Sequence, residues 1–298
     1  MTKSRLINIE ASSACDANCF MCPRDQVTKK GNLKPELAGL IAEKIKSIPN
    51  IYEISIAGRG EPTLNPDIAK LLEIFSFGGN LALVTTGTRA NPSLIEALNR
   101  YVKYLRLSVS SLEPVLFQKV HTTLNYDKTW ANIRTFIQEL DKDKIIIHLV
   151  GGPVIYPGLE RTIDFFRENE INNIRLFPLW NRGGSKQQDS EKEIRYNLIQ
   201  KYGLIAPEND YLSKEEITDI QSGPRFCPVG DSSLCINFKG NIVGCFQDFA
   251  YHTVIGDISD PNLDIMKLFE NRRKILGKMP VCKMCNSFSE LVGKNAQR

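Results

Sequence analysis

Three cysteines fall within a short stretch near the start of the chain, at Cys15, Cys19 and Cys22, directly after the apolar run 6–11. Iron–sulfur cubanes are held by cysteine thiolates and normally take four of them, so this triad leaves one iron without a protein ligand. A metal with an open coordination position can bind and activate a small molecule. The spacing therefore predicts a catalytic cluster in the loop after the first apolar run.

Two other interpretations of the triad stay open at this point. Positions separated by four and then three residues share one face of a helix, so the cysteines would also suit a buried helical core. A zinc site would need a fourth ligand nearby, and the first histidine of the chain is His121.

Short apolar runs alternate with longer segments of helical period between residues 5 and 180, which is typical of a parallel α/β sheet. The number of units predicts an open, partial (β/α)6 barrel followed by a small C-terminal unit. Ligands bind at the carboxyl ends of strands in such sheets, and the triad occupies the first of these loops. We expect strands near 5–11, 51–57, 80–86, 103–109, 144–150 and 173–179, and helices near 35–48, 66–77, 92–100, 128–140 and 158–169.

Composition places few further limits on function. The chain of 298 residues is 42% hydrophobic and 24% charged, as expected of a globular protein. A net charge of +4 without a dense basic stripe argues against a nucleic-acid partner. We see neither a membrane-spanning run nor a signal sequence, so we expect a cytoplasmic protein. Eight cysteines are then more typical of metal ligands or reactive thiols than of disulfides.

The triad resembles the signature of the radical S-adenosylmethionine (SAM) superfamily, in which the amino and carboxylate groups of SAM chelate the open iron. In that superfamily one electron from the cluster cleaves SAM to a 5′-deoxyadenosyl radical, which abstracts hydrogen from substrate. Further elements follow successive expected strands in the family's order. By resemblance, the residues that contact SAM are Gly58, Gly60, Glu61, Pro62, Thr86, Gly87, Ser108, Ser110 and Gly151.

Two positions depart from the family pattern. Arg59 replaces the first glycine of the family's G-G-E-P element. A guanidinium at the mouth of the site would suit a substrate with phosphate or carboxylate oxygens, and an outward-pointing arginine is the alternative. Thr86 stands where asparagine is usual.

The sixth expected strand runs into Asn181-Arg182-Gly183-Gly184. This element resembles one in the 2-deoxy-scyllo-inosamine dehydrogenases of the superfamily, where the arginine reaches substrate hydroxyls. The resemblance makes Arg182 a substrate-binding residue; a solvent-exposed arginine in a glycine-rich exit is the alternative.

Five further cysteines occur only in the C-terminal part of the chain. Segments 233–238 and 241–246 read as a β-hairpin turning at Lys239-Gly240, and a helix is expected near 263–277. Four of the thiolates could enclose a metal completely, as zinc ribbons also do. The pattern resembles the truncated SPASM, or twitch, domain of radical SAM enzymes, which carries one auxiliary [4Fe–4S] cluster. Its ligands would be Cys227, Cys245, Cys282 and Cys285.

Cys235 is left over once these seven ligands are assigned. It is either a small buried residue or a hydrogen-atom donor that quenches a substrate radical. Gln247 stands where the dehydrogenase has a substrate-holding glutamate, and a neutral amide cannot act as a base.

These resemblances divide the chain into a core at 1–182, a linker at 183–222 and an auxiliary-cluster unit at 223–298. They imply SAM and two [4Fe–4S] clusters, a small-molecule substrate, and an external one-electron donor such as flavodoxin or ferredoxin. The expected reaction is oxidation of a carbinol in a sugar or aminocyclitol to a ketone. A sugar epimerase using Cys235, a peptide-modifying maturase and a non-enzymatic metal protein are the alternatives.

Overall fold

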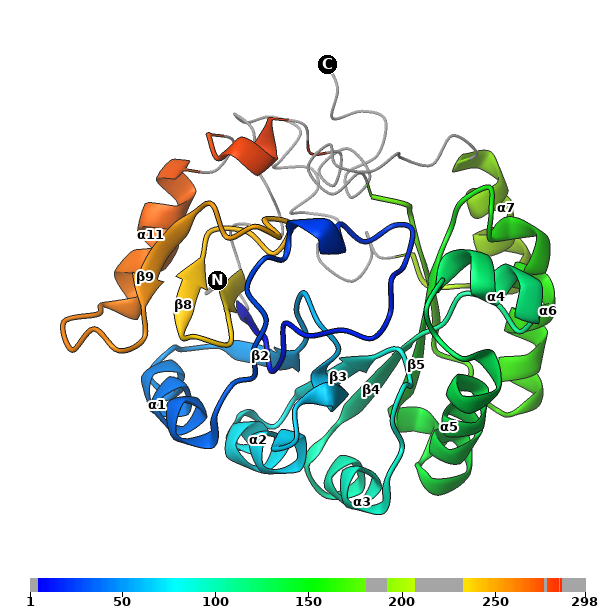
Figure 1. The fold of residues 1–298 in the computed structure, drawn as a ribbon, viewed down its shortest axis with the longest axis horizontal. Helices are drawn as coiled ribbons and strands as arrows, with labels where there is room; N and C mark the ends of the chain where they lie inside the picture. Colours follow the sequence, from blue (N-terminus) through cyan, green and yellow to red (C-terminus); the bar gives the residue numbers. More distant parts are fainter. Residues whose placement is uncertain (1–4, 181–191, 207–232, 276–277, 284, 286–298) are drawn as a thin grey trace.

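The computed structural model describes residues 5–180, 192–206, 233–275, 278–283 and 285 (Figure 1). Nine strands form one sheet in the order β6-β5-β4-β3-β2-β1-β7-β8-β9. Strands β1 to β6 pair in parallel with their neighbours, as the sequence predicts. The strands are β1 (Arg5–Ile9), β2 (Ile51–Ile56), β3 (Leu81–Thr85), β4 (Tyr104–Ser108), β5 (Ile145–Val150), β6 (Ile174–Phe177), β7 (Ser233–Ile236), β8 (Asn241–Val243) and β9 (Val254–Asp257).

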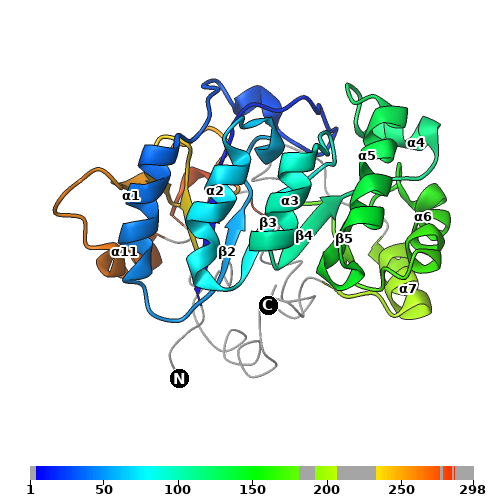
Figure 2. The same ribbon diagram turned by 90° about the horizontal axis from the view of Figure 1, so that it is seen from below.

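Helices line the outside of this curved sheet, with α11 at one end and α7 at the other (Figures 1 and 2). The helix after each of the first five strands was expected, and each lies within a few residues of its predicted range. Helix α4 and strand β9 were not expected. The helices are α1 (Pro35–Lys46), α2 (Ile68–Phe75), α3 (Pro92–Tyr101), α4 (Pro114–Val120), α5 (Tyr126–Glu139), α6 (Tyr156–Glu168), α7 (Lys192–Tyr202) and α11 (Ile265–Ile275).

The two faces of the sheet differ in chemistry. On β1, Ile7 and Ile9 are fully buried in the hydrophobic core together with residues of the surrounding helices. Asn8, between them, faces the other way and stands in register with Ser55 of β2 and Cys235 of β7. Because side chains alternate along a strand, the same pleat places aliphatic groups outward and polar groups inward. At Asn8, Ser55 and Cys235 the interior of the partial barrel therefore carries polar side chains.

Helix starts follow local signals in the sequence. The side chains of Asn91 and Asn125 accept hydrogen bonds from the backbone N–H groups of Leu94 and Lys128, which caps α3 and α5. Helix α1 begins at Pro35, whose fixed φ suits the first helical position. The loop before each of these helices therefore ends at a defined residue. The residues at the ends of neighbouring parallel strands lie side by side.

The C-terminal hairpin continues the sheet of the barrel. Strand β7 pairs in parallel with β1, from Leu6 opposite Ser233 to Ile9 opposite Ile236. Strand β8 then pairs antiparallel with β7, and Gly240 turns the hairpin with φ of +86°. The α/β partial barrel with a C-terminal hairpin and helix is confirmed, and the hairpin lies directly beside the first strand of the core.

Part of the expected linker is described. Helix α7 packs near α6, and Arg195 donates from Nε to the Leu176 carbonyl oxygen of β6 at 3.0 Å. Ile205 forms a parallel bridge with Arg175 at the same edge. The rest of segment 183–222 lies outside the described residues, so the division into domains stays a prediction.

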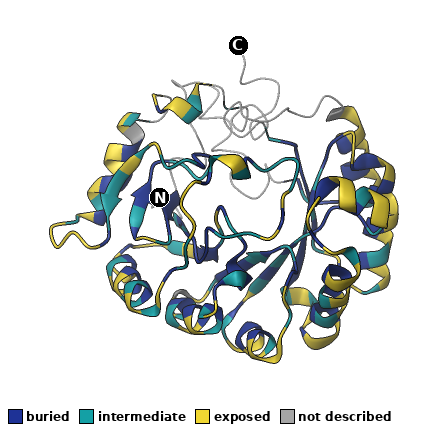
Figure 3. Cartoon of the chain, viewed as in Figure 1, coloured by how far each residue is buried: buried dark blue, intermediate teal, exposed yellow. Residues whose placement is uncertain are grey.

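Burial follows the same layering, with buried strands and helices whose exposed stripes face outward (Figure 3). Within the described ranges, no helix has the length and apolar character needed to cross a bilayer.

Candidate active site

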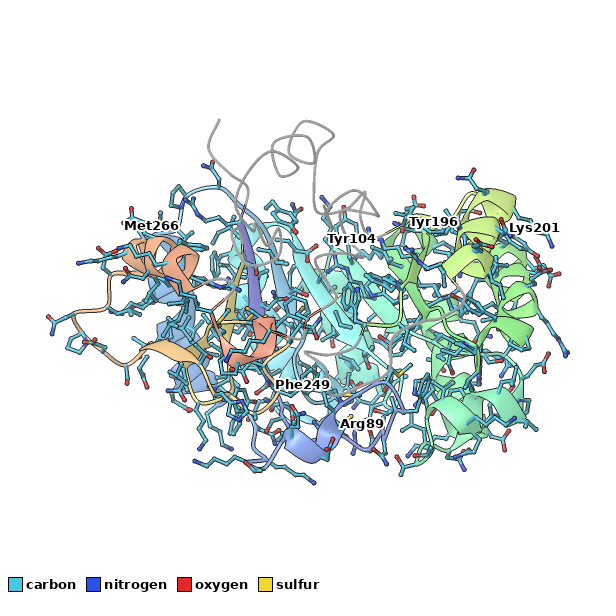
Figure 4. The ribbon with its side chains drawn as sticks, turned by 90° about the horizontal axis from the view of Figure 1, so that it is seen from above. Arg89, Tyr104, Tyr196, Lys201, Phe249 and Met266 are labelled. Carbon is cyan, nitrogen blue, oxygen red and sulfur yellow. The ribbon has the colours of Figure 1, made fainter. Side chains whose placement is uncertain are left out.

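A cavity of about 220 Å³ lies inside the barrel at the carboxyl ends of the strands. In Figure 4, Phe249 and Arg89 lie toward the carboxyl ends of the strands, and Tyr104 lies at the amino end of β4. Residues from five strand-end loops line the cavity. The sequence-predicted residues among them are Cys15, Cys19, Cys22, Gly58, Gly60, Glu61, Thr86, Ser108 and Ser110.

The cysteine loop is closed at its base and held from a neighbouring loop. Ser13 donates its backbone N–H to the Gly31 carbonyl oxygen at 2.9 Å, and Gly31 donates back to Ser13 Oγ at 2.9 Å. Thr122 and Thr123, which follow α4, donate to the carbonyl oxygens of Asn18 and Asp16 at 2.8 and 2.6 Å. These contacts fix the loop between the first two cysteines.

The Gly58–Glu61 loop lies directly on the backbone that precedes Cys15. A Cβ on Gly60 would stand 2.3 Å from the carbonyl oxygens of both Ser12 and Ala14. Glu61 donates its backbone N–H to the Ala14 carbonyl oxygen at 2.8 Å. Only glycine permits such an approach, so position 60 brings the loop and the cysteines together.

The Glu61 carboxylate organises the loop. It is 2% exposed and accepts hydrogen bonds from Thr63, Thr85 and Thr86. The Thr86 N–H and hydroxyl both donate to Oε2 at 2.9 Å. Because its oxygens are already bonded to these donors, the side chain ties the loop after β2 to the end of β3. Thr86, where asparagine was expected, therefore supports Glu61.

The other strand-end residues differ in whether they line the cavity. Ser110 lines the cavity, and its buried hydroxyl has no hydrogen-bond partner among the described residues. His148 of β5, directly opposite Ser108, lines the same cavity, and no described residue forms a hydrogen bond with its Nε2. His148 was not predicted from the sequence, although a lone polar residue in the aliphatic run 145–150 is the signal that could have found it. Three predicted contacts do not line the cavity: Pro62, Gly87 and Gly151.

The electrostatics disfavour free thiolates at this site. Burial raises the pKa of the Cys15 thiol to about 11 and raises the pKa of Cys19 further, with Cys22 and Cys15 adding to the effect. Burial also lowers the pKa of His121 to about 4, and its Nδ1 lies 2.9 Å from Cys19 Sγ. A bound cationic iron centre reverses this preference, because the metal stabilises the deprotonated thiols.

The residues present fit a SAM-bound cluster. Cys15, Cys19 and Cys22 face one cavity, and the orphaned Ser110 hydroxyl and His148 imidazole require polar partners from whatever fills it. Within the described ranges, no three His, Cys, Asp or Glu side chains come close enough to share a single metal ion. The thiolates of a cubane bind different irons, so they stand farther apart than the ligands of one ion.

A second cavity of about 210 Å³ adjoins the first and shares Cys22, Ala57, Gly58 and Arg59 with it. Its remaining walls come from β1, β7 and the segment after Cys245. Cys235 is 3% exposed here, and burial raises the pKa of its thiol, so the group is a neutral S–H. The other lining residues are Asn8, Glu10, Ile236, Phe246 and Phe249.

Arg59 does not point outward, so that expectation for its side chain was wrong. It lines both cavities, and a contact with substrate oxygens stays a prediction. It is 5% exposed, and its guanidinium donates to the carbonyl oxygens of Asp248, at 2.8 Å, and Cys245, at 3.3 Å. Glu10 Oε2 lies 3.5 Å from its Nη1, and the Tyr251 ring packs 4.3 Å from its Cζ. The side chain therefore clamps the C-terminal segment to the loop after β2.

The C-terminal cysteines are described only in part. Cys245, Cys282 and Cys285 are partly exposed. Gly244 packs so closely on Met279 that a Cβ would stand 2.7 Å from its Sδ, and Cys282 donates its N–H to the Met279 carbonyl oxygen. The segments carrying the three cysteines thus converge. Cys227 and Arg182 lie outside the described residues.

Comparison with known proteins decides the family. The model of the radical SAM superfamily matches residues 9–166. The chain belongs to the radical SAM superfamily. Membership implies SAM and a [4Fe–4S] cluster as cofactors, which agrees with the residues that line the first cavity.

The proteins similar to this chain differ in the molecules named with them. The chain is 22% identical to the S-adenosyl-L-methionine-dependent 2-deoxy-scyllo-inosamine dehydrogenase of Niallia circulans, over 95% of this chain and 93% of the relative. The crystal structure of BtrN with AdoMet and 2-DOIA has a TM-score of 0.60 at 18% identity, covering 97% and 95% of the two chains. Streptococcus suis SuiB bound to its precursor peptide has a TM-score of 0.72 at 18% identity, covering 98% and 71%.

Proposed function

We propose that this radical SAM enzyme oxidises a carbinol of a sugar, aminocyclitol or similar polyol to a ketone. The observation that carries the proposal is the match to an aminocyclitol dehydrogenase along nearly the full length of both chains. The peptide-bound SuiB structure has a higher TM-score, but a larger part of that chain has no counterpart here.

The second cavity supports this substrate class. Phe246 and Phe249 offer flat apolar surfaces, whereas Asn8 in β1 and Glu10 directly after it offer polar groups. A polyol ring has apolar C–H faces and polar hydroxyls, so it matches a cavity with both. Trp180, close in sequence to Arg182, lies 6.2 Å from Phe246 between ring centroids. We infer that this cavity, which shares four lining residues with the first, receives the substrate.

The chain's residues would then have separate roles in this reaction. Cys15, Cys19 and Cys22 hold the cluster, the Gly58–Glu61 loop and the polar strand ends hold SAM, and Cys245 with its partners holds an auxiliary [4Fe–4S] centre. When bound, these groups supply a radical that takes the carbinol hydrogen atom and an acceptor for the electron left behind. The hydroxyl proton must leave to a base, and Glu10 is the carboxylate in the substrate cavity.

Epimerisation is a second candidate, favoured by the neutral thiol of Cys235 in the same cavity. A hydrogen atom from this thiol would restore a C–H bond on the opposite face of the carbon. The reaction would then be redox-neutral for the substrate, and the thiyl left behind would need an electron and a proton from the external donor and solvent.

Product mass separates the two reactions. Anaerobically reconstituted protein would be incubated with SAM, dithionite and a panel of aminocyclitols and sugars in deuterated water. Oxidation yields 5′-deoxyadenosine and a product that has lost two hydrogens, and Cys235→Ala retains it. Epimerisation yields a product with one deuterium in place of hydrogen, and Cys235→Ala abolishes it. Turnover of a small precursor peptide, with none of the polyols consumed, would refute both assignments.

A further inference from the structure

Two arginines are buried on either side of Cys245. Arg272 of α11 is 1% exposed and donates from Nε to the Gly244 carbonyl oxygen at 2.7 Å. Arg59 reaches the same segment from the barrel and donates to the carbonyl oxygens of Cys245 and Asp248. Two guanidinium groups therefore bond to the backbone at and beside one expected metal ligand.

The charge of Arg272 is not balanced by the described residues. Among the described residues its only other hydrogen bond runs from Nη1 to Ser233 Oγ at 3.5 Å, and its buried Nη2 has no hydrogen-bond partner there. Arg59 differs, because Glu10 stands 3.5 Å from its Nη1. Burying a cation without a counter-charge costs several kcal/mol. An anion close to Arg272 would therefore stabilise this buried charge.

The carboxylates of Glu10 and Asp248 already accept other hydrogen bonds. Glu10 accepts from the Arg59 N–H and from the Tyr251 hydroxyl. Asp248 accepts from the backbone N–H groups of His252 and Thr253 at 3.1 and 2.8 Å. The positive field also reaches the barrel interior, where Arg272 and Arg59 both oppose the effect of burial on the Cys235 thiol.

We propose that Arg272, together with Arg59, is a positioning residue that supplies the counter-charge for an anionic, thiolate-ligated metal centre at Cys245 and raises its reduction potential. The inference rests on the auxiliary cluster of the proposed function. A cubane core with four thiolates is negatively charged, and it becomes more so when it accepts an electron. Buried cations and hydrogen bonds beside the ligands therefore favour the reduced state. An electron acceptor in a dehydrogenation needs this property.

The test isolates the second centre in the full chain. Cys15, Cys19 and Cys22 are replaced by alanine to remove the first cluster, and the protein is reconstituted with iron and sulfide. Two substitutions are then compared in this background, Arg272→Gln, which removes the charge, and Arg272→Lys, which keeps it.

The matched control is Arg195→Gln. Arg195 is likewise 1% exposed and donates from Nε to a backbone carbonyl oxygen, but it lies at β6, at the other end of the sheet. Iron content and a potentiometric titration followed by electron paramagnetic resonance are measured for each variant, beside the thermal midpoint.

Arg272→Gln is expected to make the centre at least about tenfold less reduced at a fixed potential, which corresponds to about 59 mV for a one-electron couple. Arg272→Lys and Arg195→Gln stay within a fraction of that shift. Loss of the second cluster from Arg272→Gln alone, with Arg195→Gln still loaded, also supports the inference. An unchanged potential in Arg272→Gln overturns it. Failure of the triple-alanine parent to bind any cluster refutes the auxiliary centre itself, so the two failures are distinguishable.

Discussion

Gly60 offers the sharpest test of how the site is assembled. Gly60→Ala places a Cβ 2.3 Å from the carbonyl oxygens of Ser12 and Ala14, whereas real Cβ contacts stay beyond 3.0 Å. The loop must move by several tenths of an ångström or more against backbone that cannot rotate away. Overpacking of this kind costs about 1–3 kcal/mol. Loss of the 2.8 Å hydrogen bond from the Glu61 N–H to Ala14 adds about 1 kcal/mol.

The expected loss is therefore about 2–4 kcal/mol of unfolding free energy, measured by urea titration followed by circular dichroism. The matched control is Gly39→Ala in α1, where a Cβ meets nothing within 4 Å. Alanine in a helix interior is better than glycine by about 0.5–1 kcal/mol, so this variant gains stability. The SAM-induced change in the spectrum of the reduced cluster should disappear in Gly60→Ala and persist in Gly39→Ala. Equal stability of the two variants would refute the close approach.

Three further substitutions test the interior of the barrel. Glu61→Gln replaces one acceptor oxygen by an NH2 group that faces donors such as the Thr86 N–H, and it should cost about 2–3 kcal/mol in urea titration; a cost under 0.5 kcal/mol contradicts the network. Arg106→Met leaves the 4% exposed Glu53 carboxylate without its two-pronged partner and should cost about 3–5 kcal/mol; a stable variant contradicts the pairing. Burial lowers the pKa of His148 well below its usual value, and the positive charges of Arg106 and Arg175 lower it further. The unfolded chain binds this proton near pH 6.5, whereas the folded chain does not, so the free energy of unfolding falls below that pH by up to about 1.4 kcal/mol per pH unit. His148→Gln should therefore flatten the dependence of unfolding free energy on pH, measured by denaturation between pH 5 and 6.5.

Local pattern predicts most of the core. The strands β1 to β6 and the helices α1, α2, α3, α5 and α6 lie where apolar runs and helical periods placed them, because burial of one face decides each helix. Helix α4 was missed because only two of its residues, Phe117 and Val120, are buried, which leaves little periodicity to detect. The pairing of β7 with β1 joins residues more than half the chain apart. No local signal specifies which edge such a hairpin will join.

The candidate site was predictable where backbone and spacing determine it. The three N-terminal cysteines and the strand-end loops meet at one cavity, as parallel strands require. Side-chain direction was not predictable. Glu61 turns into a threonine network, and Glu10, a lone charge in the apolar run 6–11, proves to be the carboxylate that joins β1, the loop after β2 and Tyr251. These outcomes depend on contacts between distant segments, which a single sequence does not display.

Arg59 shows why one glycine of a motif can be replaced and its neighbour cannot. A Cβ at position 58 would meet the Glu10 side chain at 2.7 Å, and a Cβ at position 60 would meet backbone oxygens at 2.3 Å. The side chain at position 59 instead extends to the carbonyl oxygens of Cys245 and Asp248. A chain whose C-terminal segment passes this loop gains hydrogen bonds there from a long cation, and gains nothing from glycine. The departure from the family pattern is thus explained by the pairing of β7 with β1, which brings Cys245 beside the loop after β2.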